Sequence, residues 1–372
     1  MDMTLAPASK PSNRRIVLGI LYNRQRLTKK EIAEESGLSL PTVTQTVREL
    51  TELGLVTEAG LQESTGGRRA AVSSICAGSR ISVGISISRH HVRFALLDLG
   101  REVLAKVGYN VVFSDTAAYW EDVRARMDAF LNLNGVADRK RLGIGISFPG
   151  IVDKQNLTLD FAPTLRSGSL RLSRLKSLFG EDMMLDNDAV LAAKAEVWFK
   201  PLSAPAVYLL LNRGVGGAMI TKDPMPFGAR SAEFGHMIIE KDGRPCECGN
   251  CGCFETYCSS GVIADRYDRR PLEVFFRDLE EGSERCREIW EEYLSHLVVG
   301  IHNLRCVFDC NVIIGGEMTC FIEERAADLD RRLREMSIFA DERSYVRLSN
   351  YGEFDSAIGA ALLGIERFIE SI

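Results

Sequence analysis

The chain has 372 residues, 45% of them hydrophobic and 26% charged, and a formal net charge of −5. This composition is typical of a globular protein with room for two or three domains. No run approaches the roughly eighteen consecutive apolar residues of a membrane span, and the N-terminus MDMTLAPASKPSNRR has no apolar core for a signal peptide. We therefore expect a cytoplasmic protein without membrane contact. In a reducing compartment, its ten cysteines favour free buried thiols or metal ligands over disulfides.

The charge is distributed unevenly along the chain. Residues 1–70 carry ten Lys/Arg against eight Asp/Glu, whereas the remainder carries 36 against 43. A mildly basic N-terminal region on an acidic body permits that region to bind DNA. An offset this small does not require DNA binding, because it is common by chance.

The first part of the chain predicts three short helices. Ser12 is a candidate N-cap of the first, and Thr28 with Glu31 forms a capping box for the second. Gly37 makes a sharp turn, and Ser39 then caps the third helix, LPTVTQTVRELTELG. Two short helices that meet at a Gly-containing turn indicate a helix-turn-helix. In the third helix the apolar stripe is Val43, Val47, Leu50 and Leu53, and the opposite face carries Thr42, Thr44, Gln45, Thr46 and Arg48.

The segment LVTEAGLQESTGGRRAAVS predicts two short strands around a turn, which is typical of the wing of a winged helix. Arg68 and Arg69 lie at its tip or just beyond, beside two glycines, and such arginines can enter a minor groove. The alternative is a small helical protein-interaction domain with a solvated polar face. The caps, the turn and the polar face favour DNA binding, through Ser39, Thr42, Gln45, Thr46, Arg48, Arg68 and Arg69.

The rest of the chain alternates short apolar strands with amphipathic helices. Successive strands are predicted in RISVGISIS, VRFALLDLG and REVLAKVGYNVV, and helices in AYWEDVRARMDAFLNL and near 283–307. This alternation indicates an α/β fold with ligand groups at strand ends and helix starts. Two stretches that end in Gly-rich turns, near 84–88 and 209–217, suggest two similar lobes facing a cleft.

A cysteine cluster, CECGNCGCFE, places four thiols in eight positions at Cys246, Cys248, Cys251 and Cys253. These thiols could supply all four ligands of a zinc ion, although so short a segment wraps a tetrahedron only with strain. His236, ten residues upstream, offers a longer loop and an easier geometry. Redox thiols and uncommitted cysteines are the alternatives to metal binding.

Several motifs together resemble the ROK family (repressors, open reading frames and sugar kinases). They are GISFPGIVD, LDNDAVLAAKAE, LLLNRGVGGAMI, EFGHMIIE, CECGNCGCFE and VIIGG, and the likeness spans nearly the whole chain. The most specific is C-x-C-G-x-x-G-C-x-E, which is matched in full. The resemblance implies a winged helix-turn-helix domain with a linker in residues 1–75. It also implies an actin-like (ribonuclease H-like) domain of two α/β lobes with a zinc-binding loop in residues 76–372. With such an N-terminal domain, the chain resembles the sugar-responsive repressors of the family.

The resemblance also implies the ligands of the site. One structural Zn²⁺ per chain would be held by His236, Cys246, Cys248 and Cys253, which leaves Cys251 at a variable position as a spare thiol. A sugar would be held by Asn187, Asp188, Glu233, His236 and Glu255. Taken singly, Asn187 and Asp188 are also expected as helix N-caps and the glutamates as surface acids.

The resemblance leaves two functions to weigh, a sugar sensor and an ATP-dependent sugar kinase. In family kinases Asp188 would be the general base, and a D-x-G-G-T turn and a G-T-G-x-G-G loop would cradle the phosphates of ATP. Here the first reads Ser-Ile-Ser-Arg-His over 86–90, and the second reads NRGVGG with Arg213 in place of Thr. We therefore expect a vestigial base and no enzyme. Arg89 and Arg213 leave a phosphorylated sugar open as a ligand.

The sequence thus predicts a sugar-responsive transcriptional regulator, with repression as the default. Its expected partners are operator DNA, a sugar effector and a second copy of the chain in a dimer or tetramer. A kinase with a regulatory DNA-binding region, and a DNA-binding scaffold with an inactive pocket, are the alternatives. The residues do not identify the sugar, the operator or the sign of regulation.

Overall fold

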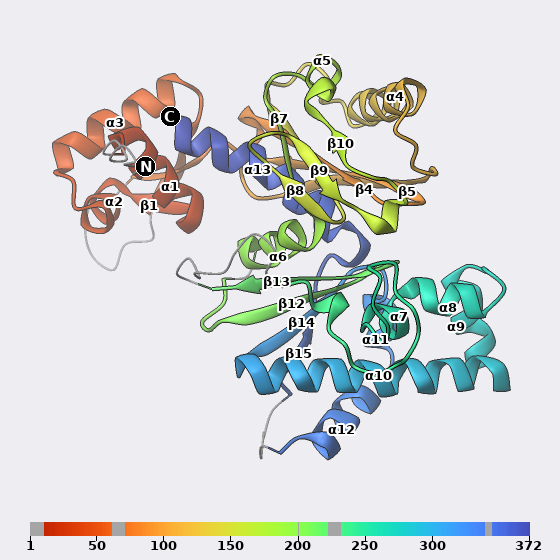
Figure 1. Cartoon of the computed structure of the whole chain (residues 1–372). Helices are drawn as coiled ribbons and strands as arrows, with labels where there is room; N and C mark the ends of the chain where they lie inside the picture. Colours follow the sequence, from red (N-terminus) through yellow and green to blue (C-terminus); the bar gives the residue numbers. More distant parts are fainter. Residues whose placement is uncertain (1–10, 62–70, 200, 222–231, 339–343) are drawn as a thin grey trace, which may run out of the picture.

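The computed structural model describes residues 11–61, 71–199, 201–221, 232–338 and 344–372. It consists of a small N-terminal unit, from α1 to β3, that we call the head, and a body of two lobes stacked one above the other (Figure 1). The head lies beside the first lobe, and the C-terminal helix α13 runs from the head to the junction of the lobes. Among the described helices, none is long and apolar enough to cross a membrane.

The head is built as the caps predict. Ser12, Thr28 and Ser39 each accept a hydrogen bond from the backbone three residues on, the Thr28–Glu31 capping box is complete, and Gly37 has the left-handed φ of 69°. The three strands form an antiparallel sheet in the order β1-β3-β2. The elements are α1 (Asn13–Arg24), β1 (Arg26–Thr28), α2 (Lys29–Ser36), α3 (Leu40–Glu52), β2 (Val56–Leu61) and β3 (Ala71–Ile75).

The first lobe contains a five-stranded sheet in the order β11-β7-β4-β5-β6 and a small three-stranded sheet, β10-β9-β8. Both β4 and β5 are buried almost throughout, because α4 covers one face of the sheet and α13 the other. The elements are β4 (Ile81–Ile87), β5 (His91–Asp98), β6 (Val103–Asn110), α4 (Ala117–Leu133), β7 (Arg141–Phe148), β8 (Ile151–Asp153), β9 (Thr158–Phe161), β10 (Leu170–Arg171), α5 (Lys176–Phe179) and β11 (Met183–Asn187).

The second lobe has a four-stranded sheet in the order β13-β12-β14-β15, with the long helix α10 packed against it (Figure 1). Its elements are β12 (Ala206–Leu211), β13 (Val215–Ile220), α7 (Glu255–Cys258), α8 (Ser260–Arg266), α9 (Leu272–Glu280), α10 (Glu284–Phe308), β14 (Asn311–Gly315), α11 (Thr319–Glu323), α12 (Ala326–Met336) and β15 (Val346–Leu348).

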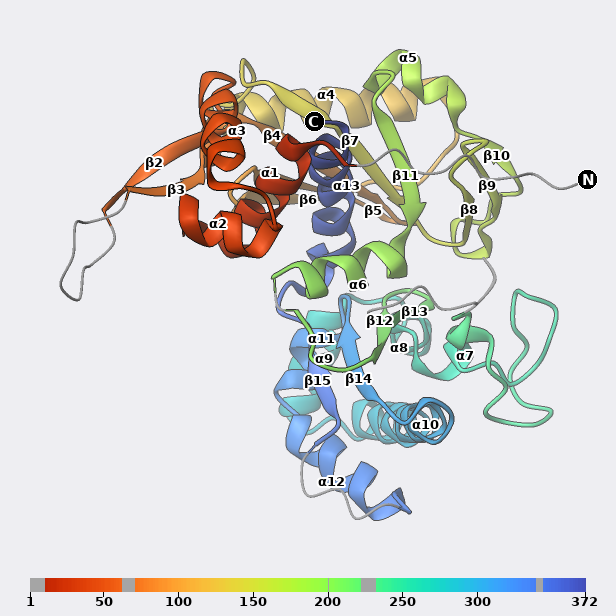
Figure 2. The same cartoon turned by 90° about the vertical axis from the view of Figure 1, so that its left-hand side faces the viewer.

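Two helices join the lobes, α6 (Asp188–Phe199) and α13 (Asp355–Ser371). The α6 helix packs on β12 and β13 of the second lobe and on α13, which lies against β4 and β7 of the first (Figure 2). The backbone of α13 lies very close to both α6 and β4. A Cβ at Gly359 of α13 would collide with the Leu191 carbonyl of α6, and a Cβ at Gly84 of β4 would collide with the Ala357 carbonyl of α13. The two helices therefore fix the geometry between the lobes.

The head shares a hydrophobic core with the body. Val17, Leu18 and Leu21 of α1 belong to the same buried cluster as Ile358 and Leu362 of α13. The Ser12 hydroxyl donates to the backbone oxygen of the C-terminal residue Ile372 at 3.0 Å. This contact places the chain's C-terminus directly beside the first helix of the head.

Candidate functional site

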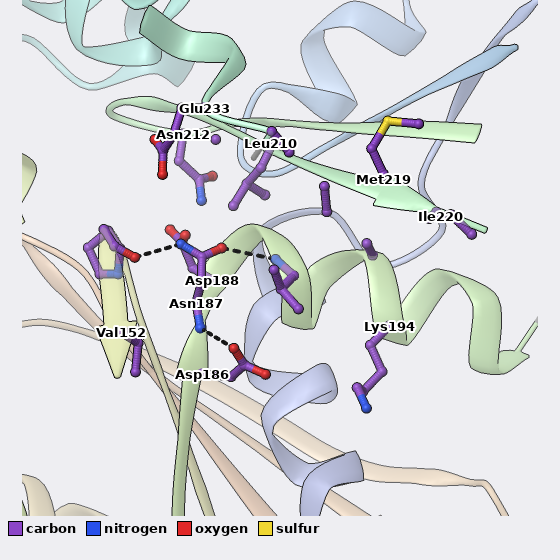
Figure 3. Close-up of a pocket in the computed structure, with 18 of the residues that line it drawn as sticks. Val152, Asp186, Asn187, Asp188, Lys194, Leu210, Asn212, Met219, Ile220 and Glu233 are labelled. Atoms are coloured by element: carbon purple, nitrogen blue, oxygen red, sulfur yellow. Dashed lines mark hydrogen bonds between the residues drawn. The ribbon is translucent and has the colours of Figure 1, made fainter. Parts of the chain in front are cut away.

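A cavity of about 1080 Å³ opens between the lobes. All five residues predicted to hold a sugar line it, namely Asn187, Asp188, Glu233, His236 and Glu255. They come from three places in the chain: the junction of β11 with α6, the 3₁₀ turn at 234–236 and the start of α7. Figure 3 shows Asn187, Asp188 and Glu233 converging at one end of this cavity. The structure thus brings the predicted set together.

Asn187 combines a structural role with its position in the cavity. Its amide nitrogen donates to the Gly150 carbonyl at 2.8 Å, and its amide oxygen accepts from the Val190 backbone at 3.1 Å, so it caps α6 (Figure 3). The capping role expected from the sequence therefore exists. These two bonds use only part of the amide: its second N–H and its second oxygen lone pair take part in neither of them.

Two carboxyl groups of the cavity have raised pKa values. Burial raises the pKa of Asp188 to about 7, the nearby Glu233 charge adds to the effect, and a hydrogen bond from the Ala189 backbone opposes it. Burial also raises the pKa of Glu233, with the Glu255 charge adding to it and His236 opposing it. Near neutral pH the Asp188 carboxyl can therefore exist in either protonation state.

His236 and Glu255 stand between the cavity and the cysteine loop. His236 Nδ1 lies 3.7 Å from Cys246 Sγ and 3.5 Å from a Glu255 oxygen, and that same oxygen lies 3.1 Å from Cys246 Sγ. Because Nδ1 faces the thiols, the other ring nitrogen remains for the cavity that His236 also lines. The loop thus fixes the orientation of two cavity residues.

The cysteine loop gathers four metal-ligand atoms. The ligand atoms of His236, Cys246, Cys248 and Cys253 all lie within 4.8 Å of one another, and Cys248 Sγ is 3.6 Å from Cys253 Sγ. In a tetrahedral zinc site with Zn–S bonds of about 2.3 Å, neighbouring ligand atoms are about 3.8 Å apart. The donor set and its spacing therefore fit one zinc ion. Cys251 is exposed and outside this group.

Two glycines shape that loop. Gly249 and Gly252 have φ values of 92° and 78°, in the left-handed region that favours glycine, and a Cβ at Gly252 would collide with the Glu240 carbonyl. These turns bring the cysteines back toward His236. The backbone of the loop therefore requires glycine at these two positions between the cysteines.

The turn at residues 86–90 is a tight hairpin between β4 and β5. Ser86 lies within β4, and the Ser88 backbone N–H donates to the His91 carbonyl at 2.9 Å. The Arg89 guanidinium donates to the carbonyls of Phe113 and Leu165 at 3.3 and 3.0 Å. In the second loop, Arg213 pairs with Asp265 at 3.4 Å. Both arginines thus have partners within the protein.

The polar face of α3 is largely as predicted. Ser39, Gln45 and Arg48 are exposed, and Thr42 is half-buried with its hydroxyl 2.8 Å from that of Ser39. Gln45 donates to Glu49 at 3.1 Å, and Arg48 donates to Glu52 at 3.0 Å. Arg68 and Arg69 lie outside the residues that the structure describes.

Two expectations for α3 are wrong. Thr46 is only 4% exposed, and its hydroxyl donates to the Thr42 carbonyl at 2.9 Å, so it belongs to the buried side of the helix. A threonine can be buried in a helix in this way because its hydroxyl bonds to the backbone one turn earlier. Leu53, expected in the apolar stripe, caps the helix end and is 45% exposed.

The sequence did not single out the other end of the cavity. Arg101, Lys194 and Trp198 line it, together with Asn23 and Arg24 of the head. The spacing of Lys194 and Trp198 after Asn187 places them along one helix, but no sequence signal brings the head to that helix. Nearer the predicted set, Lys154 pairs with Asp186, which precedes Asn187.

Comparison with known proteins gives two family matches. Residues 82–367 match the ROK family, and residues 12–57 match a winged helix-turn-helix DNA-binding family. The chain is 26% identical over 367 residues to the xylose repressor of Caldicellulosiruptor bescii, with 91% of this chain and 89% of the relative covered.

Two solved structures share the fold. A ROK family transcriptional regulator, a homologue of the Escherichia coli MLC protein, superposes with a TM-score of 0.74 at 20% identity and covers 96% of this chain and 97% of its own. A ROK family glucokinase from Streptomyces griseus, solved with glucose and AMPPNP, gives 0.62 at 21% identity and covers 76% of this chain and 98% of its own. The fold is therefore a winged helix-turn-helix followed by an actin-like, sugar-kinase-type domain. The chain belongs to the ROK family.

Proposed function

We propose that the chain is a sugar-responsive transcriptional regulator, which binds operator DNA through the head and a sugar effector in the interlobe cavity. In this proposal residues 1–75 are the DNA-binding domain and residues 76–372 the effector domain. The observation that carries it is the interlobe cavity, because this one cavity is lined both by the five predicted sugar ligands and by residues of a winged helix. The likeness to a xylose repressor supports the same function.

The chemistry of the cavity suits vicinal hydroxyl groups. Carboxylates of Asp188, Glu233 and Glu255 accept hydrogen bonds, whereas the Asn187 amide and the free imidazole nitrogen of His236 can donate or accept. A sugar presents donors and acceptors alternately around a ring, so such a mixed set holds it in one orientation. We assign Asn187, Asp188, Glu233, His236 and Glu255 as its ligands.

A structural zinc ion is part of this proposal. It would be held by His236, Cys246, Cys248 and Cys253, where it would supply the positive charge that keeps thiolates together in a small volume. The protein residues do the rest, since Glu255 and His236 are oriented toward the cavity by their contacts with the loop.

Helix α6 connects the cavity with the DNA-binding head. The helix starts at the sugar ligands, and Trp198 near its end packs on Tyr22 of the head with ring centroids 4.6 Å apart. A sugar that favours one arrangement of the lobes therefore also favours one position of the head. In a dimer on two half-sites, that position sets the spacing of the recognition helices, α3. We take repression relieved by sugar as the sign.

Several contacts argue against the kinase alternative. Phosphate transfer needs a turn that lets backbone amides approach phosphates, with Mg²⁺ held by small oxygen ligands. Here side chains with Cβ atoms occupy that turn, and Arg89 fills the space beside it with hydrogen bonds to two carbonyls. Asp188 then serves as a sugar ligand rather than as a base for transfer to ATP.

The test is operator release by sugars. The full-length protein would be bound to a fluorescent DNA duplex selected from random sequence by the protein itself, and a panel of sugars would be added. We expect one sugar class to release the duplex, and Glu255→Gln to weaken that response by about tenfold or more because it removes a charged acceptor. Operator affinity in the absence of sugar should stay unchanged.

The matched control is Glu247→Gln, which alters an exposed glutamate in the same cysteine loop, outside the cavity. It should respond like the parent protein. Loss of the response in both variants would mean that the loop, not the carboxylate, carries the effect. Sugar phosphorylation in the presence of ATP and Mg²⁺ at rates of roughly 1–1000 per second would instead identify a kinase.

A further inference from the structure

The interlobe cavity is longer than the five proposed sugar ligands require. Its lining on α6 includes Val190, Ala193, Lys194, Val197 and Trp198, which recur every three or four residues and therefore form one face of the helix. Asp188 and Trp198 stand ten residues apart, so at about 1.5 Å per residue the cavity extends about 15 Å along the helix. The other wall follows β13 over its whole length.

Figure 3 displays this extension. Glu233, Asn187 and Asp188 lie at one end, whereas Lys194, Met219 and Ile220 lie at the other. We call the part lined by Lys194, Val197, Trp198, Met219 and Ile220 the distal section. At about 1080 Å³, the whole cavity matches the upper end of the ~300–1,000 Å³ range for drug-sized ligands, which are much larger than one sugar ring.

The distal section has the chemistry of a carbohydrate subsite. Trp198 contributes an aromatic ring to the lining of this section. Lys194 and Glu366, which are 28% and 34% exposed, add polar groups to the lining. Sugar rings have an apolar face and a polar rim, so an aromatic platform beside polar groups suits them.

The charges of this region favour a neutral ligand. Lys194 pairs with Glu366 at 2.5 Å, and Lys154 nearer the first site pairs with Asp186. Arg24 pairs with Glu35 at 3.1 Å. Arg101 lies over the Trp198 ring at 5.5 Å and donates to a head carbonyl, that of Asn23. Because each of these cations already has a partner, a phosphorylated ligand gains little here.

The distal section ends on the head. Asn23 and Arg24 of α1 line the same cavity as the sugar ligands. A ligand that fills the whole cavity therefore contacts the DNA-binding unit itself, in addition to the lobes. A ligand confined to the first site reaches the head only through α6.

From these observations we propose that the effector is a neutral oligosaccharide of two or three rings. Its first ring lies among Asn187, Asp188, Glu233, His236 and Glu255, and the following rings lie along α6 on the distal section, against the head. This inference rests on the proposed function, since it requires that the first site bind a sugar. It names the class of that sugar.

The experiment is a calorimetric titration of the full-length protein with three homologous series. They are xylose, xylobiose and xylotriose; glucose, cellobiose and cellotriose; and N-acetylglucosamine with its β-1,4 dimer and trimer. We expect one series in which the disaccharide binds at least about tenfold more tightly than the monosaccharide. Glucose 6-phosphate and N-acetylglucosamine 6-phosphate test the anionic alternative.

Two variants locate the gain. Lys194→Ala and Trp198→Leu should each reduce the advantage of the longer sugar by about fivefold or more, while the monosaccharide binds within about twofold of the parent value. The control is Lys176→Ala, because Lys176 also pairs with a glutamate, Glu181, but lies outside the cavity. It should preserve the advantage.

The outcomes separate the two proposals. The proposal that the distal section binds further rings is overturned if one, two and three rings bind equally tightly in the series that binds. It is also overturned if both variants retain the advantage of the longer sugar. Either result leaves the proposed sugar sensor standing. Tighter binding of a phosphorylated monosaccharide than of any neutral oligosaccharide overturns the proposal for the distal section as well. Absence of binding by every sugar overturns the proposed function and this inference together.

Discussion

At the scale of single residues, Asp188 has the most informative chemistry. Burial and a neighbouring carboxylate raise its pKa to about 7, so its charge changes within an accessible pH range. The raised value has opposite consequences for stability and for binding. The contribution of Asp188 to the free energy of unfolding is fully present below pH 3.8, the ordinary pKa of the group. This contribution is lost as the pH rises through the folded-state pKa of about 7.

Sugar binding should depend on pH with the other sign. A sugar hydroxyl donates to the ionised carboxylate, so the affinity should rise between pH 6 and 8 and level off above, by at most about tenfold per pH unit below the pKa. Titration calorimetry at several pH values measures this. Asp188→Asn should bind more weakly and lose the pH dependence, and an unchanged slope in that variant would assign the titration to another group.

The same scale shows what sequence reasoning could and could not reach at the site. The five cavity residues that we propose as sugar ligands could be predicted because they sit in short motifs that resemble those of the family. Thr46 was mispredicted because a threonine hydroxyl can bond within its own helix and so be buried. Trp198 was missed because an aromatic residue at helical spacing gives no sign of which element it faces.

At the scale of elements, the cap and turn residues that the sequence predicts largely determine where the helices begin and end. Helices α1, α2 and α3 begin at the predicted caps, and the predicted helix near 283–307 is α10, Glu284–Phe308. These features depend on hydrogen bonds between residues three or four apart. The packing of α13 against α6 and the first lobe was not predictable, since it depends on glycines far apart in the chain that allow close approach.

The cysteine loop gives a prediction at this scale. We expect one zinc ion per chain by elemental analysis of the purified protein. Cys246→Ser should lower zinc content and weaken sugar binding, because it removes a metal ligand and a contact of Glu255 and His236. Cys251→Ser is the matched control in the same loop and should keep both. Equal loss of zinc in the two variants would contradict the assigned ligand set.

At the scale of the whole molecule, the head and the body share one core. Residues of α1 and α13 lie in a common buried cluster, and the interlobe cavity is bounded partly by the head. A shared core means that the position of the head is tied to the arrangement of the lobes. A regulator of this construction needs no separate signalling element, because α6 and α13 touch the cavity region, the lobes and the head.

Arg101 tests that coupling. Its guanidinium lies 5.8 Å from the centre of the Tyr22 ring and 5.5 Å from that of Trp198, and it donates to the Asn23 carbonyl at 3.5 Å. Allosteric coupling between two sites typically corresponds to a 5–150-fold change in affinity, about 1–3 kcal/mol. Arg101→Ala should reduce the change in operator affinity caused by a saturating sugar to a few-fold or less.

This prediction is specific because coupling and binding can be measured apart. Operator affinity without sugar is measured by fluorescence anisotropy, and monosaccharide affinity without DNA by calorimetry. We expect both to stay near the parent values in Arg101→Ala, since Arg101 belongs to neither the α3 surface nor the five proposed sugar ligands. Arg287→Ala, which removes an exposed arginine paired with Glu284 on α10, is the control. If Arg101→Ala retained the full response, the head would receive the signal through α13 or through the second copy of the chain instead.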